Sequence, residues 1–431
     1  MSHHSPRSGA RVITAILVTV IIGALAGIGA APTHAAPVPT PATDHCPHKV
    51  GTPPPVDTSE VVAPGSTTPP PLPVPESPRG GSRLAGCGVV HDPAAGALPR
   101  DLTSSGWLIA DLDSGDVIAA KDPHGRYRPA STIKVLLALV AIDELELDTT
   151  VEATDEDWMA EGDSCGMGPR GKYTNRQLLT GLIVVSGNDC ATALARELGG
   201  REQTLAKMNT KARELGALDT RAASPSGLDA PGMSSSPYDL AVIFRAAMRD
   251  DLFRELIALP TYRFPGYPRR LDVPEDKDHP AYLMQTSNHM LLDGYPGMIG
   301  GKTGYTDDAR KTFVGAVQRD GRTLVIVQMF GLTYEGNSYW DQAARMIDYG
   351  FHSPAGTRVG SLDTDSGDAA AARQDTGDTV APTTNPAAAQ RASTHSDTGP
   401  SSWPMRLLVG LGLTVIALIL LSVGLGRFSR R

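Results

Sequence analysis

The feature that most constrains this chain is an uninterrupted apolar run at positions 135–142, which ends at Asp143 and Glu144. Neither proline nor glycine breaks the run, and a helix that is apolar on every side is usually buried. Lys134 stands directly before it, where an ammonium is costly to desolvate unless it finds a partner or loses its proton. The run therefore predicts a buried core helix that begins beside a lysine in an unusual state of protonation.

Ser131 lies three positions before Lys134, so that on a helix the two side chains share one face. A serine at a helix N-terminus has unpaired backbone N–H groups and the positive end of the helix dipole around it. These conditions suit a nucleophile with part of an oxyanion hole built in. Burial and the dipole should lower the pKa of Lys134, so that its neutral amine accepts the proton of Ser131. Taken alone, the pair is more typical of an N-cap serine and a lysine whose ammonium reaches solvent.

Composition excludes some classes of function. The 431 residues carry a formal charge of −8 and no basic stripe, which argues against nucleic acid as a partner. The cysteines are Cys46, Cys87, Cys165 and Cys190, with no Cys-x-x-Cys pair and no His-Glu-x-x-His motif. We therefore expect neither a metal nor another cofactor.

The N-terminal region indicates export. Residues 1–36 combine arginines, an apolar stretch and small residues suited to cleavage, which is typical of a secretory signal peptide. An uncleaved anchor is the alternative, and both place the body where disulfides form. Residues 37–97 are proline-rich and should be extended or disordered. A bridge between Cys46 and Cys87 would tie this segment down at both ends, although the sequence leaves pairing with the other two cysteines open.

The folded body is placed at residues 98–352. Two hairpins are predicted, one from strands at 105–111 and 116–120, the other from strands at 312–318 and 323–330 around Asp320-Gly321. The helices are predicted at 177–185, 191–198, 204–215, 238–248 and 340–349. Strands at both ends with helices between them predict an α+β fold, in which one antiparallel sheet is built from both ends of the domain and packs against a helical cluster.

The C-terminal region indicates a membrane anchor. Residues 353–402 are rich in alanine, threonine, aspartate and serine and should form a disordered linker. Residues 407–426 carry no charge and are numerous enough to span a bilayer. The arginines that follow are typical of the cytoplasmic side. We therefore predict a transmembrane helix with a short cytoplasmic tail within residues 403–431, and a body on the extracytoplasmic side of the cell membrane.

Three short motifs follow one another in the predicted body: Ser131-x-x-Lys134, Ser186-x-Asn188 and Lys302-Thr303-Gly304. They fall at a predicted helix start, in a turn between helices and on a strand just before the last hairpin. Each is weak alone, and Ser186-Gly-Asn188 alone is ordinary turn chemistry. Together they form the motif set of the penicillin-binding proteins and serine β-lactamases.

The neighbouring residues narrow this resemblance. Pro129-Ala-Ser-Thr-Ile-Lys-Val135, Val185-Ser-Gly-Asn-Asp189, Ser226-Gly-Leu-Asp229 and Gly301-Lys-Thr-Gly-Tyr-Thr306 resemble the low-molecular-mass D-alanyl-D-alanine carboxypeptidases. The likeness covers roughly residues 100–350. It implies a three-layer α/β/α sandwich of the β-lactamase and transpeptidase type, and a peptidoglycan stem peptide ending in D-Ala-D-Ala as the substrate. β-Lactams should acylate the nucleophile and leave slowly.

The resemblance also implies roles for individual residues. Ser131 would attack the carbonyl of the penultimate D-alanine, Lys134 would accept its proton, and Ser186 would relay a proton to the leaving amine. Substrate contacts would come from the following residues: Asn188 to the acyl side, Lys302 and Thr303 to the terminal carboxylate, and the strand at Gly304 and Tyr305. The backbone N–H groups of Ser131 and Tyr305 would hold the oxyanion.

The same motifs occur in proteins with other functions. A class A β-lactamase usually has aspartate where this chain has Gly187, and a Glu-x-x-Leu-Asn loop that we do not find between the second and third motifs. A catalytically silent, membrane-tethered binding module on the same fold is a second rival, and endopeptidase or transpeptidase activity stays open. Cys165 and Cys190 flank the second motif in sequence. We predict that they form a disulfide pinning the loop at 161–172, the alternative being two buried thiols.

Overall fold

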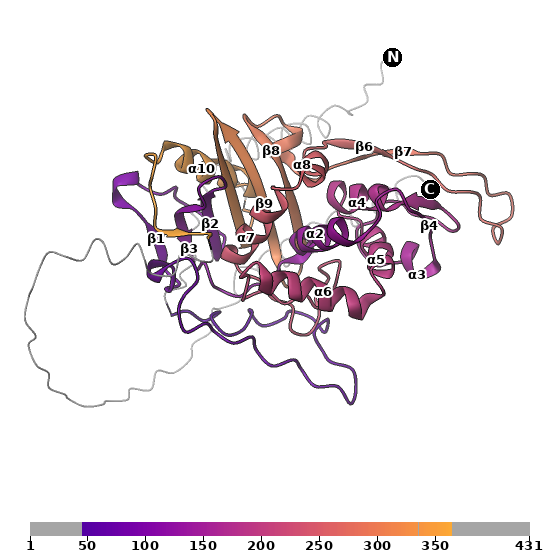
Figure 1. Cartoon of the computed structure of the whole chain (residues 1–431), viewed down its shortest axis with the longest axis horizontal. Coiled ribbons are helices and arrows are strands. Elements are labelled where there is room, and N and C mark those ends of the chain that lie inside the picture. The colour runs from indigo at the N-terminus through magenta and orange to yellow at the C-terminus, as the bar shows by residue number, and fades with distance from the viewer. Residues whose placement is uncertain (1–44, 335, 364–431) are drawn as a thin grey trace, which may run out of the picture. The chain divides into compact units, whose positions relative to one another are not determined.

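One antiparallel sheet forms the centre of the computed structural model, which describes residues 45–334 and 336–363 (Figure 1). Its strand order is β1-β3-β2-β10-β9-β8, with β11 added beside β3. The strands are β1 (Val89–His91), β2 (Gly106–Asp111), β3 (Asp116–Lys121), β8 (Met298–Thr306), β9 (Arg310–Arg319), β10 (Arg322–Gly331) and β11 (Gly360–Ser361). The predicted sheet from both ends of the domain is confirmed, because β2 from the N-terminal half pairs with β10 from the C-terminal half.

Both predicted hairpins are present. β9 and β10 pair around Asp320 and Gly321, whose φ angles of 49° and 78° match the left-handed backbone that a two-residue hairpin turn requires. β2 and β3 pair around residues 112–115. The register places Ile326 opposite Gly315 on one side and Ile109 on the other, so the two hairpins join into a continuous sheet.

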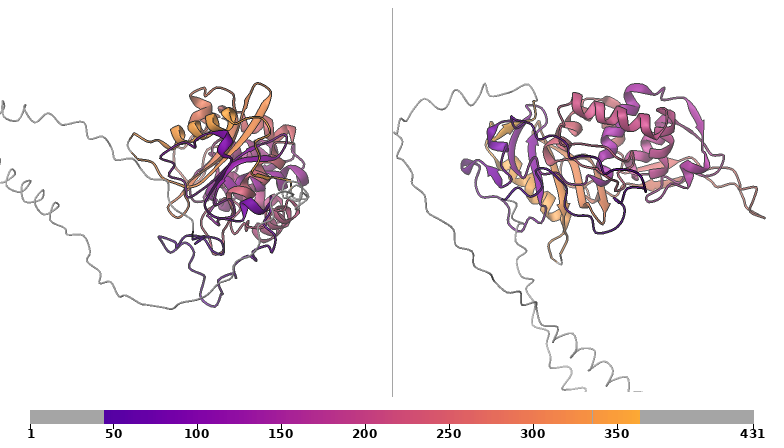
Figure 2. Two further views of the ribbon diagram at one scale, coloured as in Figure 1. Left: turned by 90° about the vertical axis from the view of Figure 1, so that its left-hand side faces the viewer. Right: turned by 90° about the horizontal axis from the view of Figure 1, so that it is seen from below.

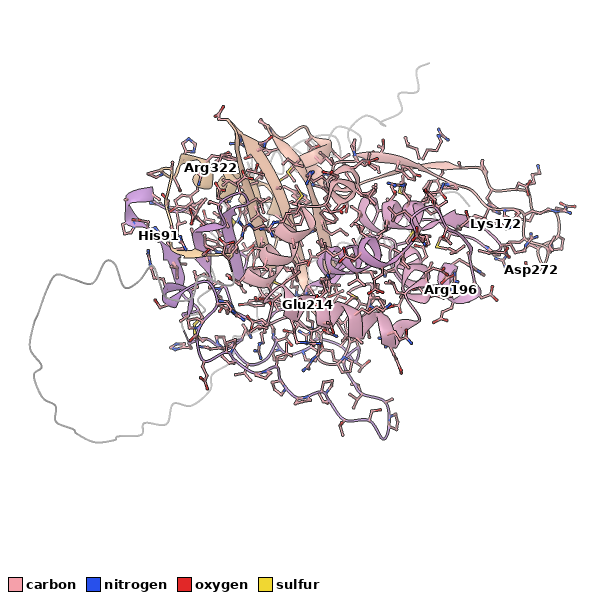
Figure 3. The ribbon with its side chains drawn as sticks, in the orientation of Figure 1. His91, Lys172, Arg196, Glu214, Asp272 and Arg322 are labelled. Atoms are coloured by element: carbon pink, nitrogen blue, oxygen red, sulfur yellow. A yellow bond between two sulfur atoms is a disulfide. The ribbon has the colours of Figure 1, made fainter. Side chains whose placement is uncertain are left out.

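Helices cover both faces of this sheet. α10 (Tyr339–His352) packs against β2, β9 and β10, and α7 (Pro237–Ala247) packs against the same three strands. Successive strand side chains point to opposite faces, so Trp107 and Ile109 join the core beneath α10 while Leu108 and Ala110 join the core beneath α7. Arg322, labelled in Figure 3, ties these layers together by donating to Asp111 of β2 and to the carbonyl of Gly350 in α10.

Most of the remaining elements lie between β3 and β8 in sequence, and two short 3₁₀ turns precede β2. The longer helices form a cluster that shares the α7-side core: α2 (Lys134–Glu144), α4 (Asn175–Val184), α5 (Asn188–Glu197), α6 (Arg201–Glu214) and α8 (Asp251–Ile257). Short elements are α3 (Asp155–Trp158), α9 (His289–Leu292), and the 3₁₀ turns η1 (Ser82–Leu84), η2 (Pro93–Ala95) and η3 (Ala130–Ile133). Two small ribbons pair β4 (Thr150–Glu152) with β5 (Lys172–Thr174) and β6 (Thr261–Phe264) with β7 (Tyr282–Gln285), the latter projecting from the helices (Figure 2).

The predicted core helix is present and begins beside Lys134, as expected. α2 starts at Lys134 and is buried along residues 134–141, whereas Ser131 lies in the 3₁₀ turn η3 just before it. Ser131 therefore lies at the helix N-terminus, but in a 3₁₀ turn and not in a turn of the α-helix. Since residues three apart eclipse one another in a 3₁₀ turn, Ser131 and Lys134 nevertheless keep a common side.

The proline-rich segment differs most from expectation. From residue 45 it is ordered against the body, and Cys46 and Cys87 form a disulfide. Proline supplies no N–H, so the carbonyls of such a segment need donors from elsewhere. Arg126, buried in the body, supplies three of them, to Val50, Leu72 and Pro73. Of the two predicted alternatives, extended or disordered, disorder is wrong from residue 45 onward. It considered whether the segment could fold alone, not whether the body satisfies its backbone.

The sheet also extends past both predicted limits of the body. β1 and β11 lie outside residues 98–352, and both pair with β3. The predicted signal peptide at 1–36, the linker from residue 364 onward and the transmembrane helix within 403–431 lie outside the described residues. Across the described ranges, no helix combines the length and apolarity needed to cross a membrane.

Candidate active site

Ser131 and Lys134 meet at the junction of η3 and α2. Lys134 Nζ lies 2.9 Å from Ser131 Oγ, donates to Asn188 Oδ1 at 2.7 Å and also donates to the carbonyl of Ser226. The lysine is fully buried, and Ser131 is half-buried. Burial holds the pKa of Lys134 well below its ordinary value, and the nearby Lys302 ammonium lowers it further. A neutral amine can use its two N–H groups on Asn188 and Ser226, which leaves its lone pair to face the hydroxyl of Ser131.

Two glycines let other backbones approach the Ser131 turn. A Cβ on Gly227, whose φ is +90°, would lie 2.1 Å from the carbonyl oxygen of Ala130. A Cβ on Gly304 would lie 2.8 Å from the backbone nitrogen of Ser131. β8 and the loop at 226–229 therefore both touch the turn that carries Ser131. The third motif needs its glycine because β8 passes too close for any side chain.

Ser186 occupies a strained position between α4 and α5. Its φ is 65°, in the left-handed region that a residue with a Cβ rarely adopts. The side chain is 3% exposed, and its Oγ has no hydrogen-bond partner among the described residues. A buried hydroxyl left unpaired is costly, and strain of this kind is found at functional sites. Ser186 thus offers a free donor and acceptor that the fold itself does not use.

Asn188 is the first residue of α5, and its side chain bonds other residues of the site. Its Oδ1 accepts from Lys134, and its Nδ2 donates to the carbonyl of Glu161 at 2.6 Å. The expected contact to the acyl side of a peptide therefore has to use the second proton of Nδ2, because the first is taken by Glu161. In addition to any substrate contact, Asn188 positions the amine of Lys134 through the hydrogen bond that its Oδ1 accepts.

Lys302 and Thr303 lie on β8. Lys302 is buried, and burial lowers its pKa to about 7. The negative charge of Asp163 has the opposite, smaller effect and raises this pKa. Its Nζ donates to the carbonyl of Thr303 at 2.8 Å. Thr303 Oγ1 lies 2.7 Å from the hydroxyl of Ser287, which is exposed. An anion bound beside Lys302 would raise the lysine pKa and favour its charged form.

Comparison with known proteins identifies the family. The sequence profile described as D-alanyl-D-alanine carboxypeptidase matches residues 93–332, which is more than half of the chain. The chain belongs to the D-alanyl-D-alanine carboxypeptidase family. It is a serine-type peptidase and a hydrolase, as the three motifs predicted.

Individual relatives support the assignment. The carboxypeptidase is 52% identical over 272 residues to D-alanyl-D-alanine carboxypeptidase DacB2 of Mycobacterium tuberculosis, covering 62% of this chain and 89% of that protein. It is 29% identical over 252 residues to the DacF carboxypeptidase of Bacillus subtilis, covering 57% of this chain and 61% of that protein. A solved D-alanyl-D-alanine carboxypeptidase from M. tuberculosis matches at 50% identity and a TM-score of 0.58, covering 63% of this chain and 99% of that one. A Streptomyces DD-transpeptidase matches at 26% identity and a TM-score of 0.54, covering 59% and 99%, which confirms the α+β fold of this class.

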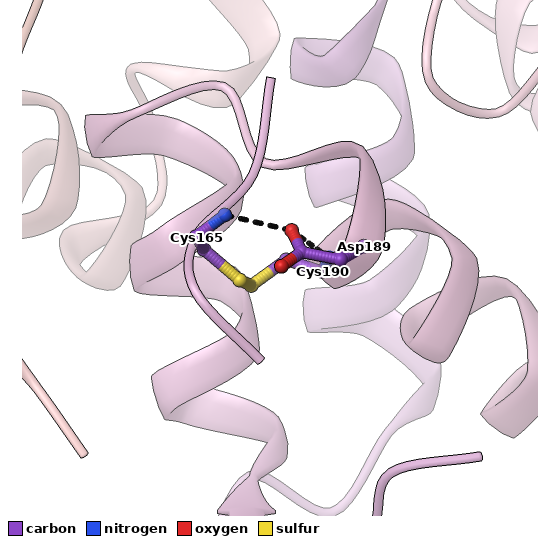
Figure 4. Close-up of side chains that lie close together, drawn as sticks. All are labelled: Cys165, Asp189 and Cys190. Atoms are coloured by element: carbon purple, nitrogen blue, oxygen red, sulfur yellow. Dashed lines mark hydrogen bonds between the residues drawn. A yellow bond between two sulfur atoms is a disulfide. The ribbon is translucent and has the colours of Figure 1, made fainter. Parts of the chain in front are cut away.

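The loop beside the second motif of the carboxypeptidase is pinned twice. Cys165 and Cys190 form the predicted disulfide. Beside it, the buried carboxylate of Asp189 accepts from the backbone N–H group of Cys165 (Figure 4). It also accepts from the backbone N–H groups of Gly166 and Met167. The loop carries the Glu161 carbonyl that binds Asn188, so both constraints act on the residue that holds Lys134.

Two groups of side chains in the described part of the carboxypeptidase resemble metal-ligand sets. One is Cys165, Asp189 and Cys190, whose sulfurs are consumed by the disulfide. The other is His124, Asp219 and Asp239. There both ring nitrogens are already bonded, one to Asp219 and one to the carbonyl of Arg79. Neither group presents a free ligand set to an ion.

Sequence analysis missed several residues of this site. Ser226 and Asp189 act through a carbonyl and a buried carboxylate, and Ser287 belongs to the loop after β7. Ser226 and Asp189 stood within stretches that resemble the family, so their proximity to the motifs was the available signal. No motif in the sequence pointed to Ser287, because only the tertiary fold brings the loop after β7 beside Thr303 of β8.

Proposed function

We propose that this carboxypeptidase removes the terminal D-alanine from peptidoglycan stem peptides that end in D-Ala-D-Ala, through an acyl-enzyme on Ser131. The observation that carries the proposal is the buried Lys134 amine, 2.9 Å from Ser131 Oγ, with a pKa held well below its ordinary value. A neutral amine at hydrogen-bond distance is the general base that a serine nucleophile needs.

Acylation begins with attack of Ser131 Oγ on the carbonyl carbon of the penultimate D-alanine, while the hydroxyl proton passes to Lys134 Nζ. The carbonyl oxygen becomes negative and accepts hydrogen bonds from the backbone N–H groups of Ser131 and Tyr305. The close approach of β8 to the Ser131 turn at Gly304 supports this pairing. One such donor contributes on the order of 10²–10³ in rate.

The leaving group then needs a proton. Lys134 passes its proton through the hydroxyl of Ser186 to the amine nitrogen, the C–N bond breaks, and D-alanine departs. The buried Oγ of Ser186 supports this relay, since within the described part of the chain its donor and lone pairs are not engaged. Water next attacks the ester, Lys134 accepts its proton, and return of that proton to Ser131 completes hydrolysis.

The terminal carboxylate of the substrate belongs beside β8. Lys302 supplies a cation and Thr303 a hydroxyl, and their charge-assisted hydrogen bonds suit a carboxylate. Because the pKa of Lys302 is about 7 without a ligand, the carboxylate draws a proton onto the amine as it binds. This coupling favours substrates with a free C-terminus. A β-lactam carries a carboxylate and a strained amide, so it would acylate Ser131 in the same way. Its leaving nitrogen stays tethered in the opened ring, which retards deacylation.

Two measurements test the proposal. D-alanine release from a defined stem pentapeptide should be abolished in Ser131→Ala and strongly reduced in Lys134→Ala, with both variants folded. Intact mass after mixing with penicillin should show one adduct in the wild type and none in Ser131→Ala. An adduct retained by Ser131→Ala would overturn the nucleophile assignment. Rapid turnover of a chromogenic cephalosporin would instead identify a β-lactamase, and ligand binding without D-alanine release would identify a silent module.

The location of the enzyme is a further part of the proposal. The signal-like residues 1–36 and the uncharged run at 407–426 support export and anchoring by a C-terminal transmembrane helix. In cells, the full chain should sediment with membranes and be cut by protease added from outside. A chain ending at residue 402 should leave the membrane fraction if its N-terminal signal is cleaved. Equal membrane retention of both would contradict a C-terminal anchor.

A further inference from the structure

A segment outside the family match reaches the active site. We define the N-terminal strap as residues 50–73, which precede the matched stretch 93–332. Arg126 closes its base by donating to the carbonyl of Val50 at one end and to those of Leu72 and Pro73 at the other. The strap is the indigo loop in Figure 1. The middle of the strap therefore packs on the part of the body next to Arg126.

What lies there is Arg128, three residues before Ser131. Arg128 is 1% exposed, so its guanidinium needs partners within the protein. Its Nε donates to Glu60 Oε1 at 2.5 Å and its Nη1 to the carbonyl of Pro53 at 2.7 Å, both from the strap. The next residue, Pro129, has its carbonyl bonded to the hydroxyl of Thr312 on β9. The strap thus holds the backbone that leads directly into the nucleophile turn.

The strap also holds the other side of the site. Asp308 lies in the turn between β8 and β9, three residues after Tyr305, and is buried. Its carboxylate accepts from the backbone N–H of Val56 at 2.5 Å and from the hydroxyl of Ser59 at 3.4 Å. The same carboxylate lies 3.9 Å from Arg128 Nε. Strap residues 53–60 therefore bond Arg128, which precedes Ser131 in the chain, and Asp308, which follows Tyr305.

These two sides carry the two N–H groups of the oxyanion hole in the function proposed above, on which this inference rests. An oxyanion donor must lie within about 2.7–3.1 Å of the oxygen that it stabilises, so the separation of the two groups has to be fixed closely. We propose that Glu60 is a positioning residue, which acts through Arg128 and Asp308 to fix the separation of the Ser131 and Tyr305 N–H groups.

The charge balance explains why Glu60 matters more than its strap neighbours. Three carboxylates act on Arg128: Glu60 lies within hydrogen-bond distance, Asp308 lies 3.9 Å away, and Asp229 acts by its charge without a direct ion pair. Without Glu60, the buried guanidinium would turn to Asp308 to regain a charged acceptor. Asp308 would then give up Val56 and Ser59, and the turn after Tyr305 would shift toward Arg128. Loss of a strap side chain would in this way change a distance inside the active site.

The test compares Glu60→Ala and Glu60→Gln with a control, Arg221→Gln, in the full chain. Arg221 donates to the carbonyl of Pro70, so its loss loosens the strap at a contact unconnected to Arg128 or Asp308. The first readout is the rate of Ser131 acylation by penicillin. The second is the infrared carbonyl frequency of the acyl-enzyme, which rises when oxyanion hydrogen bonds weaken. Thermal unfolding reports folding of each variant.

We expect Glu60→Ala to slow acylation roughly 10- to 100-fold, the effect of a small misplacement of reacting groups, and to raise the carbonyl frequency. Glu60→Gln should be intermediate, because its amide oxygen still accepts from Arg128, and it carries the test if the alanine variant does not fold. Arg221→Gln should match the wild type in both readouts. Unchanged acylation and frequency in Glu60→Gln, or an equal loss in Arg221→Gln without a frequency shift, would overturn the proposal. A wild type that forms no acyl-enzyme would remove the proposed function itself, and this inference with it.

Discussion

Gly227 stands so close to Ala130 that a Cβ on the glycine would lie 2.1 Å from the alanine carbonyl oxygen. No side chain fits there, and the φ of +90° at Gly227 adds strain for any residue with a Cβ. The loop that supplies the Ser226 carbonyl to Lys134 is thereby packed directly onto the turn that carries Ser131.

We therefore expect Gly227→Ala to impair acylation of Ser131 strongly, since the nucleophile turn and the Ser226 loop must separate. The left-handed backbone alone should lower the free energy of unfolding by about 1–2 kcal/mol. Gly294→Ala is the matched control, because its φ is +68° but no atom of residues 45–334 or 336–363 lies within 4 Å of the added Cβ. Thermal unfolding should show the backbone strain in both variants and a larger loss of stability in Gly227→Ala, where the Cβ also clashes. Penicillin acylation should be impaired in Gly227→Ala alone. Normal acylation in Gly227→Ala would contradict the close packing.

The pKa of Lys302 predicts how stability depends on pH. Burial lowers this pKa to about 7 in the folded state, whereas an unfolded lysine stays protonated to its ordinary pKa of 10.5. Between these values the unfolded chain binds more protons, so the contribution of Lys302 to the free energy of unfolding rises with pH. Below this folded-state pKa the buried ammonium is a net penalty, on the order of a few kcal/mol. Lys302→Met should remove this slope and raise stability near neutral pH, measured by denaturant unfolding across the neutral and mildly alkaline range, while abolishing D-alanine release. An unaltered slope in Lys302→Met would show that the amine is better solvated than its burial indicates.

Activity should depend on pH through two lysines with opposite requirements. Lys134 must be neutral to accept a proton, and its pKa is held low by burial, so kcat should fall only on acidification through that low value. Lys302 must be charged to bind a carboxylate, so KM should rise at alkaline pH as the amine loses its proton. Steady-state D-alanine release measured across pH checks whether the acidic loss of activity appears in kcat and the alkaline loss in KM. A KM that stays constant to alkaline pH would remove Lys302 from carboxylate binding.

Ser186 allows activity and stability to be separated. Its Oγ is buried and has no partner among the described residues, so Ser186→Ala should slightly raise the free energy of unfolding by removing an unpaired hydroxyl. Ser186→Gly should raise it by about 1 kcal/mol, because glycine adopts the φ of 65° without strain. Both variants should lower kcat by roughly 10²–10⁴, the range for loss of an acid–base group. Full activity in either variant would exclude Ser186 as the relay.

The disulfide beside the second motif should support both fold and site. Replacing Cys165 and Cys190 together by alanine should lower the free energy of unfolding by about 2–4 kcal/mol, as for other disulfides. Asp189 still bonds three backbone N–H groups of the loop in this variant, so part of the loop should stay in place. We expect acylation to slow moderately, because the loop that carries the Glu161 carbonyl loses one of its two constraints. Denaturant unfolding checks the first effect, and a stability equal to the wild type would contradict it.

Local patterns predicted much of this molecule. The buried helix α2, the two hairpins and the three motifs depend on residues within a few positions of one another, and they were found where expected. The proline-rich segment was misjudged because its backbone acceptors are satisfied by Arg126 and Arg128, which lie far along the chain. The 3₁₀ turn η3, which carries Ser131 just before α2, was not distinguished from the α-helix.

The sequence by itself determined the chemistry available to this protein: a serine, two lysines and a second serine in motifs whose types and spacing indicate acyl transfer. Tertiary structure alone decided the state of those groups. Burial lowers the pKa of Lys134 and Lys302, and the contacts of Gly227 and the strap set the position of the Ser131 turn. Desolvation and distance arise from residues remote in sequence, so no local pattern specifies them.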